Sequence, residues 1–225
     1  TRIVRERKLP SFSAYCQLLQ TSPEQEKDYF INAITTNLTS FFREQHHFNY
    51  LSEIELPRLL TTKKHSKRIR IWSSASSTGE EPYSIAITLQ EAIGQALVNW
   101  DAKILATDID SNVVEQGKQA VYPIESVEAI PHHLKSKYFK QGRGQSNKPI
   151  PVNNLIRSYI TFKQLNLLAP WPMTGPFDII FCRNVIIYFD KQTQINLFER
   201  YYNMLAPGGL LILGHSENLG CYQKY

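Results

Sequence analysis

The fold is decided by the stretch Arg70-Ile71-Trp72-Ser73-Ser74-Ala75-Ser76-Ser77-Thr78-Gly79-Glu80-Glu81. The short apolar run at its start predicts a buried strand, and the small residues that follow predict a tight loop. Apolar residues then recur at helical spacing from about Glu80 to Ala96, which predicts a helix. A strand, a loop and a helix in this order begin a strand–helix–strand unit, so the stretch favours an α/β fold.

The same alternation continues toward the C-terminus. Three further apolar runs predict strands, and two stretches between them predict helices. The strands are Lys103–Thr107, Phe177–Cys182 and Leu210–Leu213, and the helices are 111–120 and Lys191–Leu205. Strands that alternate with helices indicate a mostly parallel sheet that is covered by helices on both faces.

Two regions depart from this alternation. Residues 11–60 show helical spacing and few strand signals, which predicts an N-terminal helical domain over residues 1–60. Farther along, Gly142-Arg143-Gly144 and Asn153-Asn154 punctuate short β-prone runs such as Tyr159–Phe162. We therefore expect a second domain over residues 61–225, with a small antiparallel β-subdomain inserted at the sheet edge at about 138–163.

Composition excludes several classes of protein. With 42% hydrophobic and 20% charged residues, the 225-residue chain is not broadly disordered. No run approaches the roughly 18–20 apolar residues that span a bilayer, and no signal-peptide core is visible, so we expect neither membrane insertion nor secretion. Cys16, Cys182 and Cys221 lie far apart without metal-ligand spacing, which speaks against a disulfide framework or a zinc site and suits a reducing cytoplasm.

The positive charge is concentrated in one third of the chain. Residues 1–70 hold 12 Lys and Arg against 7 Asp and Glu, whereas residues 71–225 hold 13 of each. The excess of five lies mainly in Arg2–Lys8 and Lys63–Arg70. A basic segment next to a neutral one favours docking on an acidic partner, and a solvated basic face without a specific partner is an equally good interpretation of charge alone.

Polar residues follow the predicted strands, where parallel sheets bind ligands. The loop Ser73–Gly79 contains one glycine, so it matches neither a dinucleotide fingerprint nor a phosphate-binding loop. Asp108 ends the second strand, where a carboxylate can accept both hydroxyls of a ribose. The alternative role, capping the next helix, fits Asp110 better than Asp108. Asn166 follows another β-prone run and either reads an adenine edge or caps a turn.

The third strand has the most unusual end. The apolar run that includes Phe181 and Cys182 stops at the polar pair Arg183-Asn184, and Tyr188 follows four residues after Asn184. Polar groups at such a strand end face the central cleft of an open α/β sheet. The alternative is that the pair caps the transition from strand to helix and that Tyr188 is a core tyrosine.

Five blocks of sequence together resemble the bacterial chemotaxis receptor methyltransferases of the CheR family. The blocks are Thr35–Glu44, Trp72–Tyr83, Ala106–Asp110, Phe177–Asp190 and Gly214–Asn218, and their order and spacing fit over nearly the whole chain. The resemblance implies a helical domain, which we expect to be truncated at its start, a Rossmann-like methyltransferase domain and a small antiparallel β-subdomain. Two features depart from the family pattern: the sequence has no counterpart for the family's final antiparallel hairpin, and Cys221–Tyr225 does not obviously match the family.

The resemblance also implies a function and a cofactor. The family esterifies glutamate side chains with S-adenosylmethionine and releases S-adenosylhomocysteine. Residues assigned to the cofactor by this resemblance are Asn37, Thr39, Arg43, Glu81, Asp108, Asn166, Leu167, Cys182, Arg183 and Asn184. Among them, Glu81 would hold the methionyl ammonium group, Asp108 the ribose, and Asn166 with Leu167 the adenine. Arg43 and Tyr188 would lie beside the transferred methyl group as catalytic residues.

The implied reaction needs few protein groups. A glutamate carboxylate, with a pKa near ~4.3, is already ionised at neutral pH and attacks the methyl carbon directly, so no general base is required. The absence of any Ser-His-Asp or paired-carboxylate pattern agrees with this. No metal is expected, and we interpret His46, His47 and His215 as structural or surface residues, because no cysteine or carboxylate stands at metal spacing.

The implied partners are methyl-accepting chemotaxis receptors, and we expect a cytoplasmic enzyme that is recruited to membrane receptor arrays. The basic N-terminal third would attract the acidic receptor helices. The β-subdomain around Tyr138–Phe162 resembles the part that, in some members of the family, binds a receptor's C-terminal tail peptide by adding a strand. Two alternatives stay open. A nucleic-acid methyltransferase would usually need a [DN]PP[YF]-like strand end, where this chain has Cys182-Arg183-Asn184-Val185. The second alternative is a non-catalytic module that binds the cofactor or the receptor.

Overall fold

The fold is described from a computed structural model of the chain, which describes residues 2–140 and 148–220. The predicted turn at Gly142-Arg143-Gly144 and the cysteine Cys221 lie outside the described residues. Among the described residues, no helix has the length and apolar character that crossing a membrane requires.

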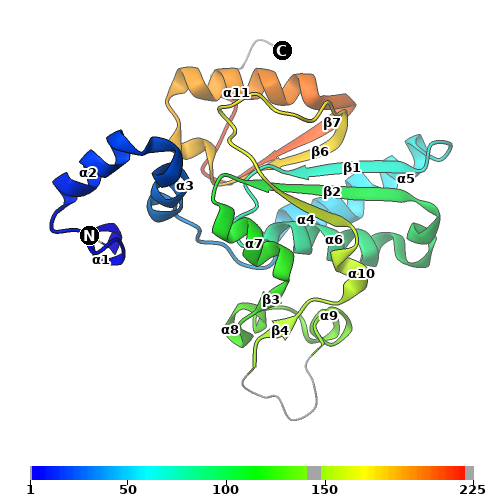
Figure 1. The fold of residues 1–225 in the computed structure, drawn as a ribbon. Helices are drawn as coiled ribbons and strands as arrows, with labels where there is room; N and C mark the ends of the chain where they lie inside the picture. The colour runs from blue at the N-terminus through cyan, green and yellow to red at the C-terminus, as the bar shows by residue number, and fades with distance from the viewer. Residues whose placement is uncertain (1, 141–147, 221–225) are drawn as a thin grey trace.

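A five-stranded sheet forms the centre of the molecule (Figure 1). Its strands are β1 (Arg68–Ser73), β2 (Asp101–Asp108), β5 (Ile160–Gln164), β6 (Phe177–Cys182) and β7 (Leu205–Leu213). They lie in the order β5-β2-β1-β6-β7, and every neighbouring pair is parallel. The predicted α/β class is therefore confirmed, and the carboxyl ends of all five strands meet at one edge of the sheet.

The last strand is longer than the sequence predicts. The sequence predicts a strand over Leu210–Leu213, yet β7 begins at Leu205 and includes the turn-prone Pro207-Gly208-Gly209. Its pairing with β6 shifts register between Phe177 and Ile179, because Phe177 faces Leu205 while Ile179 faces Leu210. The irregularity absorbs the extra residues, so the turn-prone segment lies within the strand as a bulge.

The prediction that Tyr159–Phe162 belongs to the antiparallel insertion is wrong for most of that run. Residues from Ile160 onward form β5, which pairs in parallel with β2 from Ile104 to Asp108. Phe162 is buried on the face that carries Tyr83, with the two rings 5.8 Å apart. The run is apolar because it packs at the edge of the central sheet, and a short β-prone run does not reveal which sheet it joins.

The antiparallel pair is smaller and lies elsewhere. It joins β3 (Val121–Tyr122) to β4 (Ile150–Pro151), and an isolated bridge joins Phe139 to Val152. The short helices α8 (Ile124–Val127), α9 (His132–Tyr138) and α10 (Asn154–Arg157) surround it. Strands of two residues show no alternation of polar and apolar positions, which explains why β3 was not predicted.

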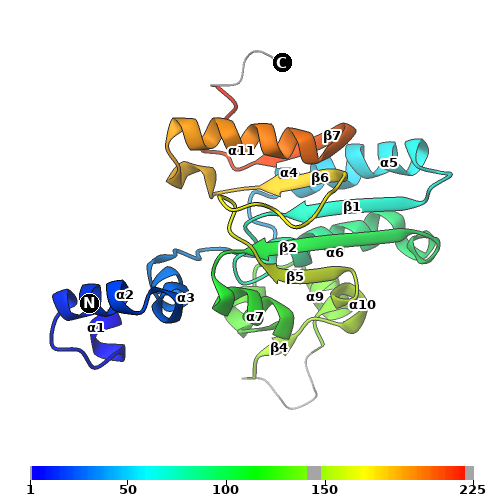
Figure 2. The same cartoon turned by 45° about the horizontal axis from the view of Figure 1, so that its top comes forward.

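Helices cover both faces of the sheet (Figures 1 and 2). One face carries α6 (Glu80–Ile93), the 3-10 helix η2 (Gly94–Asn99) and α7 (Ser111–Gln119), and the other carries α11 (Lys191–Met204). Successive residues of β1 separate the two cores, since Ile71 belongs to the first and Trp72 to the second. This is the arrangement that alternating strands and helices predict.

The N-terminal helices fall into two groups. The first group contains α1 (Arg2–Glu6), α2 (Phe12–Thr21) and α3 (Pro23–Ile34), and Figure 2 shows it beyond the carboxyl ends of the strands. The second group, α4 (His46–Tyr50), the π-helix η1 (Leu51–Glu55) and α5 (Leu56–Thr62), packs on the sheet domain. Phe48, Leu51 and Leu56 share the core of Ile71. The division of the chain at residue 60 stays a prediction.

Candidate functional site

A cavity of about 450 Å³ opens at the carboxyl edge of the sheet. Its walls come from the linker between α3 and α4, the loop after β1, the ends of β2 and β5, and the loop after β6. Every residue that was predicted for the site lines this cavity, with one exception. The lining includes Asn37, Thr39, Arg43, Glu81, Asp108, Asn166, Leu167, Arg183, Asn184 and Tyr188.

The exception is Cys182, which is fully buried in β6 and packs in the core beneath α11. Burial raises the pKa of its thiol to about 12. Alternate residues of a strand point to opposite faces, and the chain leaves the strand at this residue. The following residues Arg183 and Asn184 reach the cavity, whereas the Cys182 side chain does not.

Asp108 is a nearly buried carboxylate on the cavity wall, with 8% of its surface exposed. It accepts hydrogen bonds from the backbone N–H groups of Ser77 at 2.8 Å and Asp110 at 3.1 Å. Burial raises its pKa, and these two donors oppose the shift. A carboxylate offers about four acceptor positions, so Asp108 retains capacity for hydroxyl groups of a ligand.

Asp110 connects the linker to the sheet. Its side chain caps α7 by accepting the Asn112 N–H at 2.9 Å, as the sequence favoured. Its other oxygen accepts the Thr35 hydroxyl at 2.7 Å and the Asn37 amide at 2.9 Å. Asp110 therefore holds the start of the linker over the cavity. Sequence reasoning missed this role, because Thr35 and Asp110 are 75 positions apart.

Glu81 and Arg183 form a buried ion pair at the cavity floor. The Glu81 Oε2 atom lies 2.8 Å from Arg183 Nη1, and its Oε1 atom accepts the Ser73 hydroxyl at 2.7 Å. Burial raises the pKa of Glu81, and the charge of Arg183 opposes that shift. A carboxylate so deeply buried is stable as an anion only with such partners, and it attracts any further cation that enters the cavity.

Arg183 contacts a second carboxylate, Glu44 of the linker, at 3.3 Å. Glu44 also accepts hydrogen bonds from the His215 N–H at 3.2 Å and from the Asn184 amide at 3.4 Å. Burial acts to raise the pKa of Glu44, but the hydrogen bond between the His215 ring Nδ1 and Glu44 Oε1, 2.8 Å long, and the charge of Arg183 lower it to about 2. Glu44 is thus an anionic anchor that ties the linker to the loop after β6.

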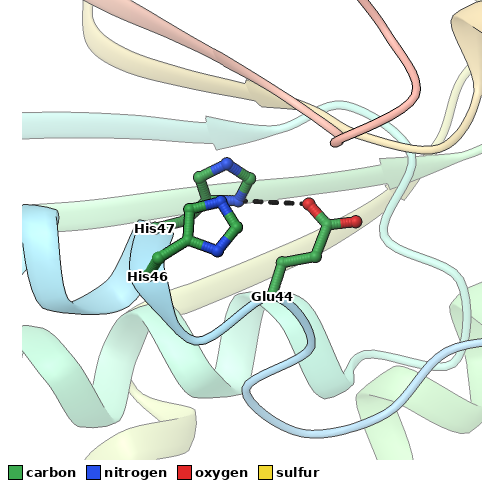
Figure 3. Close-up of side chains that lie close together, drawn as sticks. All are labelled: Glu44, His46 and His47. Carbon is green, nitrogen blue, oxygen red and sulfur yellow. Dashed lines mark ion pairs between the residues drawn. The ribbon is translucent and has the colours of Figure 1, made fainter.

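The side chains of Glu44, His46 and His47 lie close together (Figure 3). Their potential metal-ligating atoms lie within 4.8 Å of one another, and Figure 3 marks the contact between His47 Nδ1 and Glu44 Oε2, which is 3.4 Å long. Burial and the charge of Arg183 lower the pKa of His47 to about 4. The structure thus places the Glu44 carboxylate at metal-ligand spacing from both histidines, which the sequence did not indicate. Because Glu44 is paired with Arg183 at this point, we interpret the cluster as part of the anchor.

The two predicted catalytic residues line the cavity from different segments of the chain. Arg43, on the linker, donates from Nη1 to the Leu38 carbonyl at 2.7 Å, which folds the linker back on itself. Tyr188 ends the 3-10 helix η3 (Ile186–Tyr188), and 65% of its surface is exposed. It is therefore not a core tyrosine. Because Tyr188 is exposed and also lines the cavity, it is accessible to a group that enters from solvent.

Asn166 takes one of the two roles that the sequence left open, the capping of a turn, and it also lines the cavity. Its side-chain oxygen accepts the Leu168 N–H at 2.9 Å, which caps a turn after β5. The same residue lines the cavity together with Leu167 and Leu168. Asn166 can therefore hold the turn and present its amide group to a ligand at once.

Comparison with known proteins agrees with this geometry. Residues 37–225 match the family model described as "CheR methyltransferase, SAM binding domain". The chain is 47% identical over 219 residues to "Chemotaxis protein methyltransferase 2" of Pseudomonas aeruginosa, covering 97% of this chain and 76% of that protein. It is 42% identical over 225 residues to "Chemotaxis protein methyltransferase" of Escherichia coli, covering 99% and 76%.

Solved structures show a much weaker likeness. The chain is similar to "DhpI-SAM-HEP complex" with a TM-score of 0.39 and 12% identity, over 75% of this chain and 58% of that one. A likeness at this level does not bear on the activity of the chain.

Proposed function

The chain belongs to the CheR family of chemotaxis methyltransferases, and on that premise we propose that it methylates glutamate side chains of chemotaxis receptors. It is an S-adenosylmethionine-dependent methyltransferase of chemotaxis. The family membership disfavours the nucleic-acid alternative. The observation that carries the proposal is the cavity in which Glu81, Asp108 and Arg43 converge from three segments.

The cavity residues suit the cofactor. A volume of about 450 Å³ is typical of a small-molecule site. The buried Glu81 carboxylate would hold the methionyl ammonium group, and Asp108 would accept the ribose hydroxyls. Asn166 and Leu167, at the end of β5, would contact the adenine. Burial raises the pKa values of both carboxylates because it removes water from their charged forms. A ligand that brings an ammonium group or hydroxyl groups would stabilise these charged forms in place of the water.

The residues of the chain have a positioning task. S-adenosylmethionine supplies a methyl group on a positively charged sulfur, and S-adenosylhomocysteine remains after that group is transferred. The accepting glutamate needs no base, since its carboxylate is ionised above a pKa of ~4.3. Arg43 orients this carboxylate from the linker, and Tyr188 orients it from η3. Alignment of two bound reactants contributes on the order of 7–11 kcal/mol, which is the main effect available here.

Receptor recognition follows from charge. The first helix group, with exposed cations such as Arg5 and nearby Lys8, lies beyond the carboxyl ends of the strands, the edge at which the cavity opens (Figure 2). A basic surface near the site would steer acidic receptor helices toward it and would be screened by salt. We further propose that the β3–β4 region offers an edge for a receptor's C-terminal tail peptide, and that receptor binding brings the cytoplasmic enzyme to membrane arrays.

The test is transfer of a radiolabelled methyl group from S-adenosylmethionine to receptor-enriched membranes and, separately, to tRNA. We expect label on receptors that is released by mild alkali, as glutamate methyl esters are, and none on tRNA. Receptors whose acceptor glutamates are replaced by alanine serve as the control. Label on tRNA alone would support the nucleic-acid alternative.

Calorimetric titration with S-adenosylhomocysteine separates the remaining alternative. Binding without transfer to any receptor would indicate a non-catalytic module. A wild-type chain that binds no S-adenosylhomocysteine, under conditions where it is folded, would contradict the proposed site itself.

A further inference from the structure

Glu217, in the Gly214–Asn218 segment that follows β7, has an unusual set of partners. Its Oε2 atom accepts the backbone N–H groups of Gly214 at 2.8 Å and Asn184 at 2.9 Å. Its Oε1 atom accepts those of Val185 at 2.9 Å and Ile186 at 2.8 Å. These donors fill the acceptor positions of the carboxylate. The carboxylate group of Glu217 is thus held by four backbone N–H groups.

The loop that Glu217 binds needs such a partner. Asn184 has a φ of 57°, in the left-handed region that residues with a side chain rarely adopt. The chain turns here from β6 into η3, so the N–H groups of Asn184, Val185 and Ile186 have left the strand ladder. Backbone donors that are partly buried require acceptors, and Glu217 supplies them.

Gly214 provides a second, independent observation. A Cβ atom at this position would lie 2.7 Å from the Asn184 amide nitrogen and 2.9 Å from Glu217 Oε2. Its own φ does not require glycine, so the close approach of the two segments is the constraint. The segment after β7 and the loop after β6 are therefore packed against each other without room for a methyl group.

The loop carries much of the cavity wall. Arg183, Asn184, Val185 and Tyr188 all line the cavity, whereas Glu217 does not. On its other side, the Asn184 amide donates to Glu44 of the linker at 3.4 Å. Glu217 can therefore influence the site only through the loop.

We infer that Glu217 is a positioning residue for methyl transfer, which sets the placement of Asn184 and Tyr188 by binding the backbone between β6 and η3. The inference rests on the proposed function. It differs from a role in holding the fold together, because β6 and β7 pair over Ile179–Cys182 without Glu217. The effect of Glu217 on cofactor binding should be smaller than its effect on transfer, because Asn184 is the predicted cofactor residue whose backbone N–H Glu217 accepts, whereas Glu81 and Asp108 come from α6 and β2.

The chemically matched variant is Glu217→Gln. Glutamine has the same shape, but its NH2 group would replace one acceptor oxygen and would face two N–H donors. Two of the four backbone hydrogen bonds to this side chain would be lost, one or two of them from the loop, and the loop would move away from the new amide. Glu217→Asp keeps the charge but shortens the side chain, so it should retain part of the function.

The experiment compares turnover per S-adenosylhomocysteine-binding site, with sites counted by calorimetric titration. For Glu217→Gln we expect a fall in kcat of about 10- to 100-fold, since a small misplacement of reacting groups has effects of this size, and a smaller fall in S-adenosylhomocysteine affinity, since Asn184 is a predicted cofactor residue of the loop. Gly214→Ala should show the same pattern, and Glu217→Asp an intermediate one. Ser216→Ala, an exposed neighbour, and Glu199→Gln, an exposed glutamate of α11, are the controls and should match the wild type.

A double-mutant cycle with Tyr188→Phe gives the second readout. If Glu217 acts through the loop, the effects of Glu217→Gln and Tyr188→Phe on kcat should be clearly less than additive. Full additivity, wild-type turnover per site in Glu217→Gln, or a loss that only follows the number of binding sites would each overturn the inference. Failure of the wild type to transfer methyl groups would instead refute the proposed function, so the two failures are distinguishable.

Discussion

The Nη1 atom of Arg183 lies 2.8 Å from Glu81 Oε2, and both residues are almost completely buried. Arg183 leaves β6 and Glu81 starts α6, so the pair joins two elements that are 102 positions apart at the carboxyl edge of the sheet. The same guanidinium contacts Glu44 of the linker. One cation thus holds together the floor and the roof of the cavity.

We predict that Glu81→Gln weakens S-adenosylhomocysteine binding by about 10-fold or more, because a neutral amide cannot attract the ligand's ammonium group. The amide oxygen can still accept the hydrogen bond from Ser73, so we expect only a small change in melting temperature beside the loss of affinity. Calorimetric titration measures the affinity. Glu91→Gln, on the same helix but outside the cavity, should bind like the wild type. Equal affinity in both variants would remove Glu81 from the cofactor site.

Arg43→Ala should lower methyl transfer by about 100-fold or more, because the incoming carboxylate loses the group that orients it. S-adenosylhomocysteine affinity should fall much less. Radiolabel transfer at saturating cofactor measures the effect, and Arg68→Ala, an exposed arginine at the opposite end of β1, is the control. Near-wild-type turnover in Arg43→Ala would exclude this residue from the reaction.

Tyr188→Phe tests whether the Tyr188 hydroxyl takes part in methyl transfer. Because 65% of Tyr188 is exposed, the free energy of unfolding should stay within about 0.5 kcal/mol of the wild type. Turnover should fall by about 10-fold, the value of one hydrogen bond made during transfer. The matched control is Tyr202→Phe, which removes a hydroxyl from an equally exposed tyrosine of α11. A similar turnover in both variants would contradict the proposed role.

His47 predicts a pH dependence of stability. Its pKa is about 4 in the folded chain, mainly because of burial, against 6.5 for an unperturbed histidine. Between these values the unfolded chain binds a proton that the folded chain does not, so the free energy of unfolding falls as pH decreases from 6.5 to 4. His47→Gln lacks this group. The wild type should therefore lose stability relative to the variant across that window.

Urea unfolding of both proteins at several pH values measures this difference. Above pH 6.5 the difference in free energy of unfolding between the wild type and His47→Gln should be constant. Below pH 6.5 the wild type should become progressively less stable relative to the variant. If the two curves of stability against pH run parallel between pH 6.5 and 4, His47 is not held neutral by the fold.

Gly79→Ala should destabilise the fold by about 1–3 kcal/mol. Gly79 has a φ of 103°, and a Cβ atom there would lie 2.7 Å from the Tyr122 hydroxyl and 3.1 Å from the backbone of Gly117. Gly94→Ala is the control, since it has a positive φ but open space around it. Thermal unfolding should show a clearly larger loss for Gly79→Ala. Equal losses would show that space around Gly79 is not limiting.

Several features of the site could be predicted from the sequence. Asp108 and Arg183 stand directly after apolar runs, and in a parallel sheet the residues that follow strands gather at one edge, so local patterns were sufficient to bring them together. The residue-level resemblance added the linker residues Asn37, Thr39 and Arg43, which local patterns did not single out. All of these residues line one cavity, and the experiments described above test what the site binds.

The sequence by itself determined that four apolar strands alternate with helices and that polar residues follow the strand ends, because periodicity and burial are recorded in neighbouring residues. Only the tertiary structure decided that β5 joins the central sheet, that Asp110 holds Thr35, and that Glu217 binds the loop of Asn184. These contacts join residues that are tens of positions apart, and local propensity contains no information about which distant groups the packed chain brings within hydrogen-bonding distance.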